Sequence, residues 1–114
     1  MKRVQAVVRP ERLEAVQHRL AESGFHGIMV VDVRGHGSET SSVGEYRGAS
    51  FGMSVKHKLM VDLVVEDGEV PAAVEAIASA ARTGNVGDGL IFVMDVAAVY
   101  QIRTSAEGGA ALHS

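Results

Sequence analysis

Four short stretches of the chain are rich in hydrophobic residues and predict β-strands, and the first of them alternates in part between hydrophobic and polar residues. The first covers residues 2–8 and puts Val4, Ala6 and Val8 on one face. The others, rich in β-branched residues, cover 28–34, 58–65 and 90–94. Two further stretches, 10–24 and 67–81, carry apolar residues at helical spacing. The pattern therefore predicts the element order strand–helix–strand–strand–helix–strand.

This order is the split βαβ, or ferredoxin-like, arrangement: an α+β fold, βαββαβ, with an antiparallel four-stranded sheet and two helices on one face. The second and third strands carry apolar residues on both faces, so the face without helices would be apolar too. We expect Ile28, Val30, Met60 and Val64 to lie on that bare face. A bare apolar face predicts that other copies of the chain cover it.

Two regions lack a clear period. Residues 35–55 hold five glycines and a Ser/Thr cluster, and a loop of this length in a small domain is usually functional. After the fourth strand, Asp95 is suited to cap a short helical turn at 96–100, and 102–104 is a candidate edge strand. We expect a domain at 1–104, a long loop at about 36–56, and a flexible C-terminal tail at 105–114.

Composition narrows the function. The 114 residues make one domain, with 46% hydrophobic residues, a formal charge of −3 and no cysteine. The lack of cysteine excludes disulfides and thiolate sites and fits a cytoplasmic location. No basic block points to nucleic acid, and no apolar run reaches the 18 residues of a membrane span. The N-terminus enters a strand directly, so we expect no signal peptide.

The stretch Arg82-Thr83-Gly84-Asn85-Val86-Gly87-Asp88-Gly89-Leu90 is the clearest candidate site. Three glycines in six residues permit positive φ angles and close approach of another molecule to the backbone. Successive bare N–H groups in such a turn form a concavity that suits phosphate and other anions. The competing interpretation is purely structural: Gly84 ends the preceding helix, and a tight turn follows.

Several segments together resemble the PII-type signal-transduction proteins, which are trimeric regulators of nitrogen metabolism. The resemblance covers about residues 2–104. It rests on the glycine-rich stretch with Ile91-Phe92-Val93, on Glu45-Tyr46-Arg47-Gly48-Ala49, and on Ile102-Arg103-Thr104. Gly35, Gly37 and Lys58 fall at matching positions without insertions or deletions.

The resemblance implies a homotrimer with a nucleotide site in each cleft between subunits and a long loop that contacts a partner, such as a membrane transporter or an enzyme. In this view backbone N–H groups wrap the phosphates, Lys58 and Arg103 add charge, Asp62 lies near the ribose, and apolar residues line the adenine slot. The implied nucleotide-binding residues are Val7, Gly35, His36, Gly37, Ser38, Lys58, Asp62, Val64, Gly87, Asp88, Gly89 and Arg103. The implied effector-loop residues are Glu45, Tyr46, Arg47, Gly48, Ala49, Ser50 and Phe51.

The chain departs from the family pattern in its charges. Ser38, Leu90 and Gln101 replace residues that are usually basic, and Glu39 replaces a glutamine. Because charged hydrogen bonds to an anion are worth about 1.5–3 kcal/mol each, ADP or AMP becomes as good a candidate ligand as ATP. Glu39 is able to ligate Mg²⁺ but would repel 2-oxoglutarate, so we expect weak or absent 2-oxoglutarate binding.

The loop lacks the family's modification site, because Phe51 replaces the tyrosine that is uridylylated. The five histidines show no metal-ligand spacing, so we expect no metal site from them. No catalytic motif occurs, and we expect no enzyme, with a slow ATPase as the enzymatic alternative. The sequence also fits two further functions: a divergent sensor of bicarbonate or metal stress with ADP or AMP as co-ligand, and a metal-tolerance protein of similar build.

Overall fold

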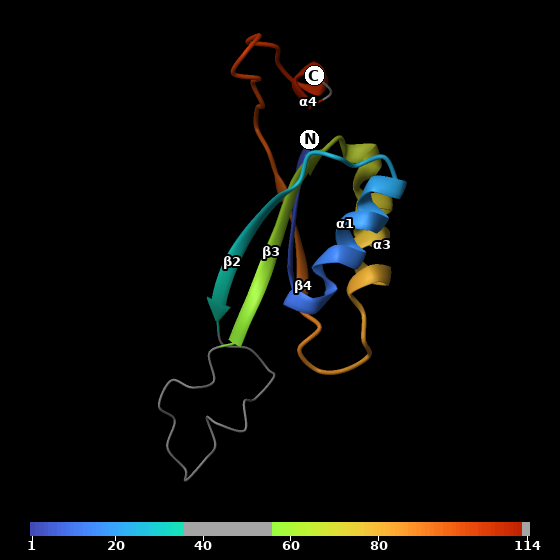
Figure 1. The fold of residues 1–114 in the computed structure, drawn as a ribbon. Coiled ribbons are helices and arrows are strands. Elements are labelled where there is room, and N and C mark those ends of the chain that lie inside the picture. The colour runs from blue at the N-terminus through green and yellow to red at the C-terminus, as the bar shows by residue number, and fades with distance from the viewer. Residues whose placement is uncertain (36–55, 113–114) are drawn as a thin grey trace.

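A four-stranded antiparallel sheet forms the centre of the molecule, and two helices cover one of its faces (Figure 1). The computed structural model describes residues 1–35 and 56–112. The long loop therefore lies outside the described residues, and with it His36, Gly37, Ser38 and the effector residues 45–51. The predicted ferredoxin-like α+β fold is confirmed.

The strands agree with the predicted stretches to within two residues. They are β1 (Lys2–Val8), β2 (Met29–Gly35), β3 (Lys56–Val65) and β4 (Leu90–Asp95), in the spatial order β2-β3-β1-β4. Antiparallel pairing places Val7 opposite Met60 of β3 and Leu90 of β4. The start of β4 therefore lies beside the end of β1.

Each of the two helices begins with one turn of 3₁₀-helix. The first pair is η1 (Pro10–Arg12) and α1 (Leu13–Glu22), and the second is η3 (Asp67–Glu69) and α3 (Val70–Ala81). Pro10 and Pro71 occupy first-turn positions, where the missing N–H costs nothing. The Glu66 N–H donates to Glu69 Oε1 at 2.9 Å and caps the second pair. Gly24, with φ of +92°, lies just beyond the end of α1.

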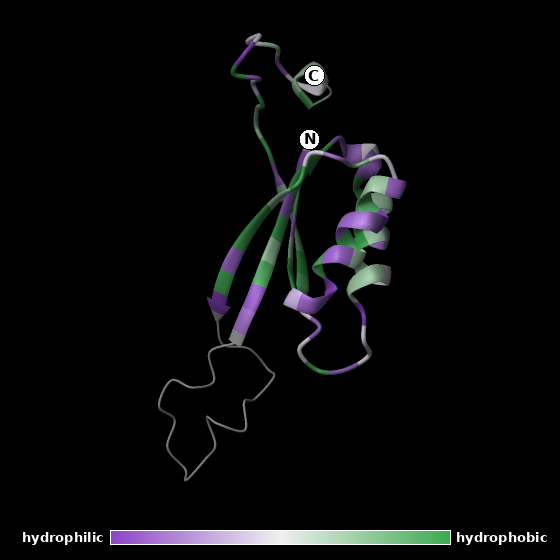
Figure 2. Ribbon diagram, viewed as in Figure 1, coloured by the Kyte–Doolittle hydropathy of each residue, from purple (hydrophilic) through white to green (hydrophobic). Residues whose placement is uncertain are grey.

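The core lies between the helices and the sheet; its buried residues are all aliphatic, and Phe25 packs against it in a partly buried position. Figure 2 shows the hydrophobic colour along the strands and the polar colour on the outward side of α1. Val4, Ala6 and Val8 share the buried face of β1, which confirms the predicted alternation. The other buried hydrophobic residues are Val16, Leu20, Val61, Leu63, Val65, Ala73, Ala76, Ile77, Ala80 and Ala81.

The sheet face away from the helices, here called the open face, differs in part from the sequence prediction. Val30 pairs with the buried Val61, so its side chain lies on the helix side, and Ile28 packs against the core. Met29 instead pairs with Asp62 on the open face and is 61% exposed. The sequence prediction therefore assigned the residues of β2 to the wrong faces of the sheet. Because β2 carries apolar residues on both faces, its sequence does not show which face is buried. The open face is apolar as expected, with Met60 and Val64 on it.

The segment after β4 forms neither the predicted helical turn at 96–100 nor the strand at 102–104. Asp95 pairs with Lys2 instead of capping a helix. Residues 102–104 form a turn closed by the Ser105 N–H to Gln101 O bond at 2.8 Å. A bridge between Tyr100 and Glu107 and the short helix α4 (Gly109–Leu112) follow. The flexibility of 105–114 stays a prediction.

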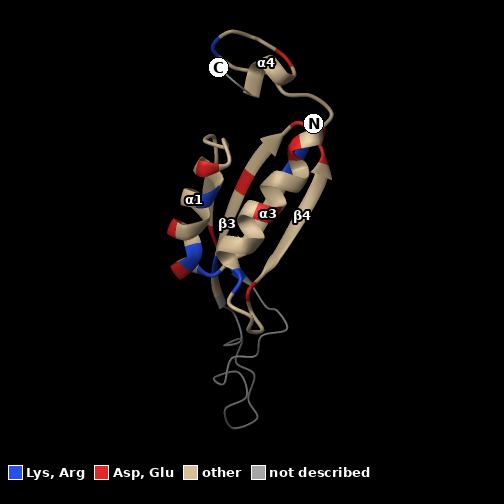
Figure 3. Cartoon of the chain, turned by 90° about the vertical axis from the view of Figure 1, so that its right-hand side faces the viewer, with Lys and Arg blue, Asp and Glu red and all other residues tan. Residues whose placement is uncertain are grey.

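The charges on the helices are mixed. Figure 3 shows acidic and basic residues side by side along α1 rather than segregated by sign. Among the described helices, none has the length and apolar character needed to cross a membrane.

Candidate functional site

Residues 82–89, here called the glycine turn, join α3 to β4 at the end of the sheet where β2 stops and β3 begins (Figure 1). The helix ends at Ala81, and Arg82 is already extended, with φ −69° and ψ 129°. Gly84 therefore does not end the helix. The interpretation of the stretch as a helix cap at Gly84 followed by a tight turn is wrong on this point. The turn must instead be explained by contacts of its own.

Three glycines of the turn have backbone conformations that other residues rarely adopt: φ is +90° at Gly84, +103° at Gly87 and +108° at Gly89. At Gly89 a side chain is also excluded because the neighbouring backbone leaves no room for it. A Cβ atom there would lie 1.7 Å from the carbonyl oxygen of Val7. Gly89 thus lets the turn lie directly against β1.

The carboxylate of Asp88 points into the glycine turn and holds its first half. Its Oδ2 accepts hydrogen bonds from the N–H groups of Thr83 at 2.8 Å and Gly84 at 2.9 Å. Its Oδ1 accepts from the Thr83 hydroxyl and, at 3.1 Å, from Arg9 Nε. The Thr83 bonds above all, with those from Gly84 and Arg9, hold the pKa of Asp88 well below its usual range. Asp88 is therefore ionised under all ordinary conditions.

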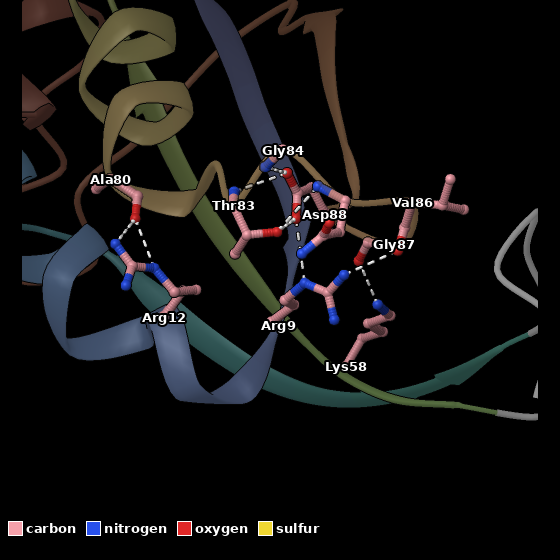
Figure 4. A network of polar contacts seen from close by, with 10 residues as sticks. Arg9, Arg12, Lys58, Ala80, Thr83, Gly84, Val86, Gly87 and Asp88 are labelled. Atoms are coloured by element: carbon pink, nitrogen blue, oxygen red, sulfur yellow. Dashed lines mark hydrogen bonds and ion pairs between the residues drawn. The ribbon is translucent and has the colours of Figure 1, made fainter.

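Two basic side chains hold the second half of the turn through its carbonyl groups (Figure 4). Arg9 Nη2 donates to the Val86 oxygen at 2.8 Å, and Lys58 Nζ donates to the Gly87 oxygen at 2.6 Å. Within the described part of the chain, no hydrogen bond uses the N–H groups of Val86 or Gly87. These N–H groups are chemically suited to bind an anion.

Comparison with known proteins gives a consistent result. Residues 1–106 match the family model described as "Nitrogen regulatory protein P-II". The Methanothermobacter thermautotrophicus "Nitrogen regulatory protein P-II 2" is 40% identical over 108 residues, which are 95% of this chain and 94% of that protein. The Escherichia coli "Nitrogen regulatory protein P-II 1" is 40% identical over 112 residues, covering 98% and 100% of the two chains.

This chain belongs to the nitrogen regulatory protein P-II family. The resemblance inferred from its motifs is confirmed, and the chain is a signal-transduction regulator of the nitrogen-regulatory class rather than a member of an enzyme family. The crystal structure of Arabidopsis thaliana PII bound to citrate matches its fold with a TM-score of 0.81 and 32% identity. That match covers 97% of this chain and 88% of the Arabidopsis chain.

The fold brings some of the expected P-II site residues together. Val7, Lys58 and the segment 87–89 meet at one end of the sheet, through the Lys58 hydrogen bond and the contact of Gly89 with β1. Gly35, the last residue of β2, pairs with Lys56 at the same end. The remaining residues at the loop root, 36–38, lie outside the described part of the chain.

Other expected P-II residues lie elsewhere in the single chain. Val64 is four residues along β3 from the partner of Val7, or about 13 Å away at 3.3 Å per residue. Arg103 follows β4, whose six residues span about 20 Å from the glycine turn. Within one chain, therefore, neither Val64 nor Arg103 meets Gly89.

Asp62, expected near a ribose, lies on the open face and is 4% exposed. Arg3 Nε donates to its two oxygens at 2.8 and 3.0 Å, and Gln5 Nε2 donates at 3.2 Å. The hydrogen bond from Arg3 is the main cause that lowers the pKa of Asp62, and Gln5 lowers it further. In this chain Asp62 is a structural acceptor; its role toward a nucleotide stays a prediction.

Asp62→Asn is expected to destabilise the protein by about 1 kcal/mol at pH 7, because the charged hydrogen bonds are lost while Arg3 remains partly solvated. A carboxyl with a lowered folded-state pKa stabilises the fold above its unfolded pKa of about 3.9 and loses this effect in acid. The gap between wild type and Asp62→Asn should therefore shrink as pH falls from about 4 to 2. Urea unfolding at fixed protein concentration measures it, with the exposed Glu75→Gln as control. A gap that is independent of pH would contradict this assignment.

Sequence reasoning missed Arg9, and it placed Thr83 in the candidate stretch without assigning it a role. Both act through side-chain contacts with Asp88, which is 79 residues from Arg9 along the chain. One signal was present: an aspartate inside an anion-binding turn needs a basic partner, and β1–β4 pairing puts the residue after β1 beside it. Histidine gives no comparable cluster. His57 Nε2 lies 3.1 Å from Asp32 Oδ1, and within the described residues no group of three metal-ligating side chains forms.

Proposed function

We propose that this P-II family member is a homotrimeric sensor that binds an adenine nucleotide between its subunits. Occupancy of the site controls, through the loop at about 36–56, whether a protein partner of nitrogen metabolism binds. One observation carries the proposal. Among the residues that the structure describes, the N–H groups of Val86 and Gly87 remain available in a turn that Asp88, Arg9 and Lys58 hold in place.

The assembly follows from two features of the chain. The open face carries exposed apolar side chains, among them Met29, Val31 and Phe92 at 61%, 49% and 44% exposure, which favours cover by further copies. Arg103 and Val64 lie too far from the glycine turn to share a ligand with it in one chain. A neighbouring copy supplies them in the proposed site, so the site is complete only in the oligomer.

The charges of the turn favour a ligand with few phosphates. Lys58 is the basic residue on the Gly87 carbonyl, while Leu90, directly after the turn, is apolar and 65% exposed. ADP and AMP are therefore proposed on equal terms with ATP, with Mg²⁺ held through Glu39 and with weak or absent 2-oxoglutarate binding. The similar Arabidopsis PII, named as bound to citrate, is a relative that accepts an anionic ligand.

The uncharged Leu90 also supports a second candidate function within the same family. In that case the nucleotide, ADP or AMP, is a co-ligand, and the sensed signal is bicarbonate or metal stress rather than nitrogen status. Bicarbonate titrated into nucleotide-loaded protein separates the two functions, because only the second predicts a nucleotide-dependent heat.

Calorimetric titration with ATP, ADP and AMP tests the nucleotide site, and light scattering tests the assembly. We expect saturable heat with at least one nucleotide and a mass of three times 12.0 kDa, or about 36 kDa. Met60→Arg puts a charge on the open face and is expected to give a monomer without nucleotide binding. The exposed Gln17→Arg, on the outward side of α1, adds the same charge elsewhere and should change neither. A monomeric wild type, or one that binds none of the three nucleotides, would refute the proposal.

A further inference from the structure

Arg9 contacts the glycine turn at two points. Its Nε lies 3.1 Å from Asp88 Oδ1, and its Nη2 donates to the Val86 oxygen at 2.8 Å (Figure 4). The side chain is only 20% exposed, and the negative charge of Asp88 balances its positive charge. The guanidinium thus faces the inside of the turn, toward the protein groups that it already binds.

The direction of these bonds decides where the nearby N–H groups point. A peptide unit is planar and trans, so its C=O and the following N–H point in opposite directions. When Arg9 holds the Val86 oxygen, the Gly87 N–H is directed away from Arg9. Lys58 does the same for the next unit, where its bond to the Gly87 oxygen directs the Asp88 N–H away from Lys58.

We propose that Arg9 is a positioning residue of the anion site, which aims the Gly87 N–H at a phosphate group without touching the phosphate itself. This inference rests on the proposed nucleotide-binding function. Arg9 fixes the Val86 peptide and, through Asp88, the first half of the turn. One side chain thereby joins the two halves of the turn and presets the geometry that the anion needs.

The chemistry of arginine suits this role better than that of lysine. A guanidinium presents donors in a rigid fork and so reaches a carboxylate and a carbonyl at the same time. A lysine has a single nitrogen on a flexible stem, which retains the charge but not the two fixed directions. The variants Arg9→Lys and Arg9→Gln therefore separate positioning from simple charge attraction.

A matched control lies three residues along the chain. Arg12 also donates from Nε and Nη2 to a backbone oxygen, that of Ala80, at 2.9 and 2.6 Å. Its target is the last turn of α3 and not the glycine turn (Figure 4). Arg12→Gln removes the same charge and the same kind of contact while leaving residues 83–89 with all of their hydrogen bonds.

The test measures the affinity of ADP by calorimetry and that of adenosine by NMR titration in the full-length protein. We expect Arg9→Lys and Arg9→Gln each to weaken ADP binding about ten- to hundredfold, because preset N–H groups are lost. Adenosine, which has no phosphate, should bind the Arg9 variants as it binds wild type. Arg12→Gln should bind both ligands as wild type does. In the ligand-free protein, the Gly87 amide resonance should shift in both Arg9 variants and not in Arg12→Gln.

Each other outcome has a definite meaning. Unchanged ADP affinity in Arg9→Gln overturns the inference, and so does near-normal affinity in Arg9→Lys combined with loss in Arg9→Gln, because charge alone would then suffice. An equal loss of adenosine and ADP binding points to general disruption and also overturns it. If wild type binds no nucleotide, the proposed function itself fails. If Arg9→Gln does not fold, Arg9→Lys and its amide spectrum decide the question.

Discussion

Gly89→Ala is expected to displace the glycine turn from β1 and to weaken ADP binding at least tenfold. The added Cβ would lie 1.7 Å from the Val7 oxygen and 2.9 Å from the Val7 carbonyl carbon, and both are backbone atoms that cannot rotate away. The backbone at Gly89, with φ of +108°, is also unfavourable for alanine. Strain and overlap together are expected to cost roughly 3–5 kcal/mol.

Gly84→Ala is the matched control, because it separates backbone strain from steric overlap. Gly84 has φ of +90°, and a Cβ there would meet no atom within 4 Å. Alanine at 84 should therefore cost only about 1–2 kcal/mol, as is usual for a left-handed conformation. Urea unfolding and ADP titration of both variants measure the difference. Equal effects of the two substitutions would mean that the contact with Val7 has no special importance.

The main elements of the fold could be predicted from the sequence because their patterns are long. β1 and β3 are seven and ten residues long, and apolar residues recur at every second position on the buried face of each strand. The apolar positions of α1 and α3, with prolines at their starts, define both helices equally well. In β2, apolar residues lie on both faces of the strand. The sequence predicted this strand correctly but did not predict which of its residues face the helices.

The failures after β4 have a different cause. The residues at 96–104 are too few for any period, so single residues such as Asp95 had to decide the prediction. Asp95 instead pairs with Lys2, which belongs to the other end of the chain. The preference of Asp95 for a helix start was therefore overridden by its ion pair with Lys2, which the sequence does not reveal because the two residues are far apart in the chain.

The candidate site likewise has a part that the sequence predicted and a part that it did not. Its glycines were recognisable because positive φ and close approach restrict the residue type at Gly84, Gly87 and Gly89. The contacts that hold the turn were not recognisable. Arg9 follows a strand far away in the sequence and contacts Asp88 and the Val86 oxygen, and Lys58, which was expected to contact a phosphate, donates to the Gly87 oxygen. A motif therefore indicated where an anion would bind, while the structure indicates what keeps the motif in shape.

Asp88→Asn is the second substitution with a large expected effect, and two physical effects oppose each other there. Removing a negative charge from an anion site favours the anion by itself. That gain is small, because Arg9 already balances the charge at 3.1 Å and the pair acts nearly as a neutral group at longer range. Loss of the turn's internal bonds acts in the other direction.

Asparagine cannot replace those bonds because it has one acceptor oxygen. If that oxygen faces the Thr83 and Gly84 N–H groups, the amide NH₂ faces the donor Arg9 Nε. If the amide is flipped, NH₂ faces two N–H donors instead. Either orientation places donors against donors, so we expect the turn to loosen and ADP affinity to fall about tenfold.

Asp95→Asn provides the control for charge, since it makes the same change at the opposite end of β4, where Asp95 pairs with Lys2. It should leave ADP affinity unchanged, whereas Asp88→Asn lowers it at every ionic strength. Tighter ADP binding by Asp88→Asn would show that the charge of Asp88 outweighs its contacts. The glycine turn would then hold its shape without the carboxylate, and the structural role assigned to Asp88 would be wrong.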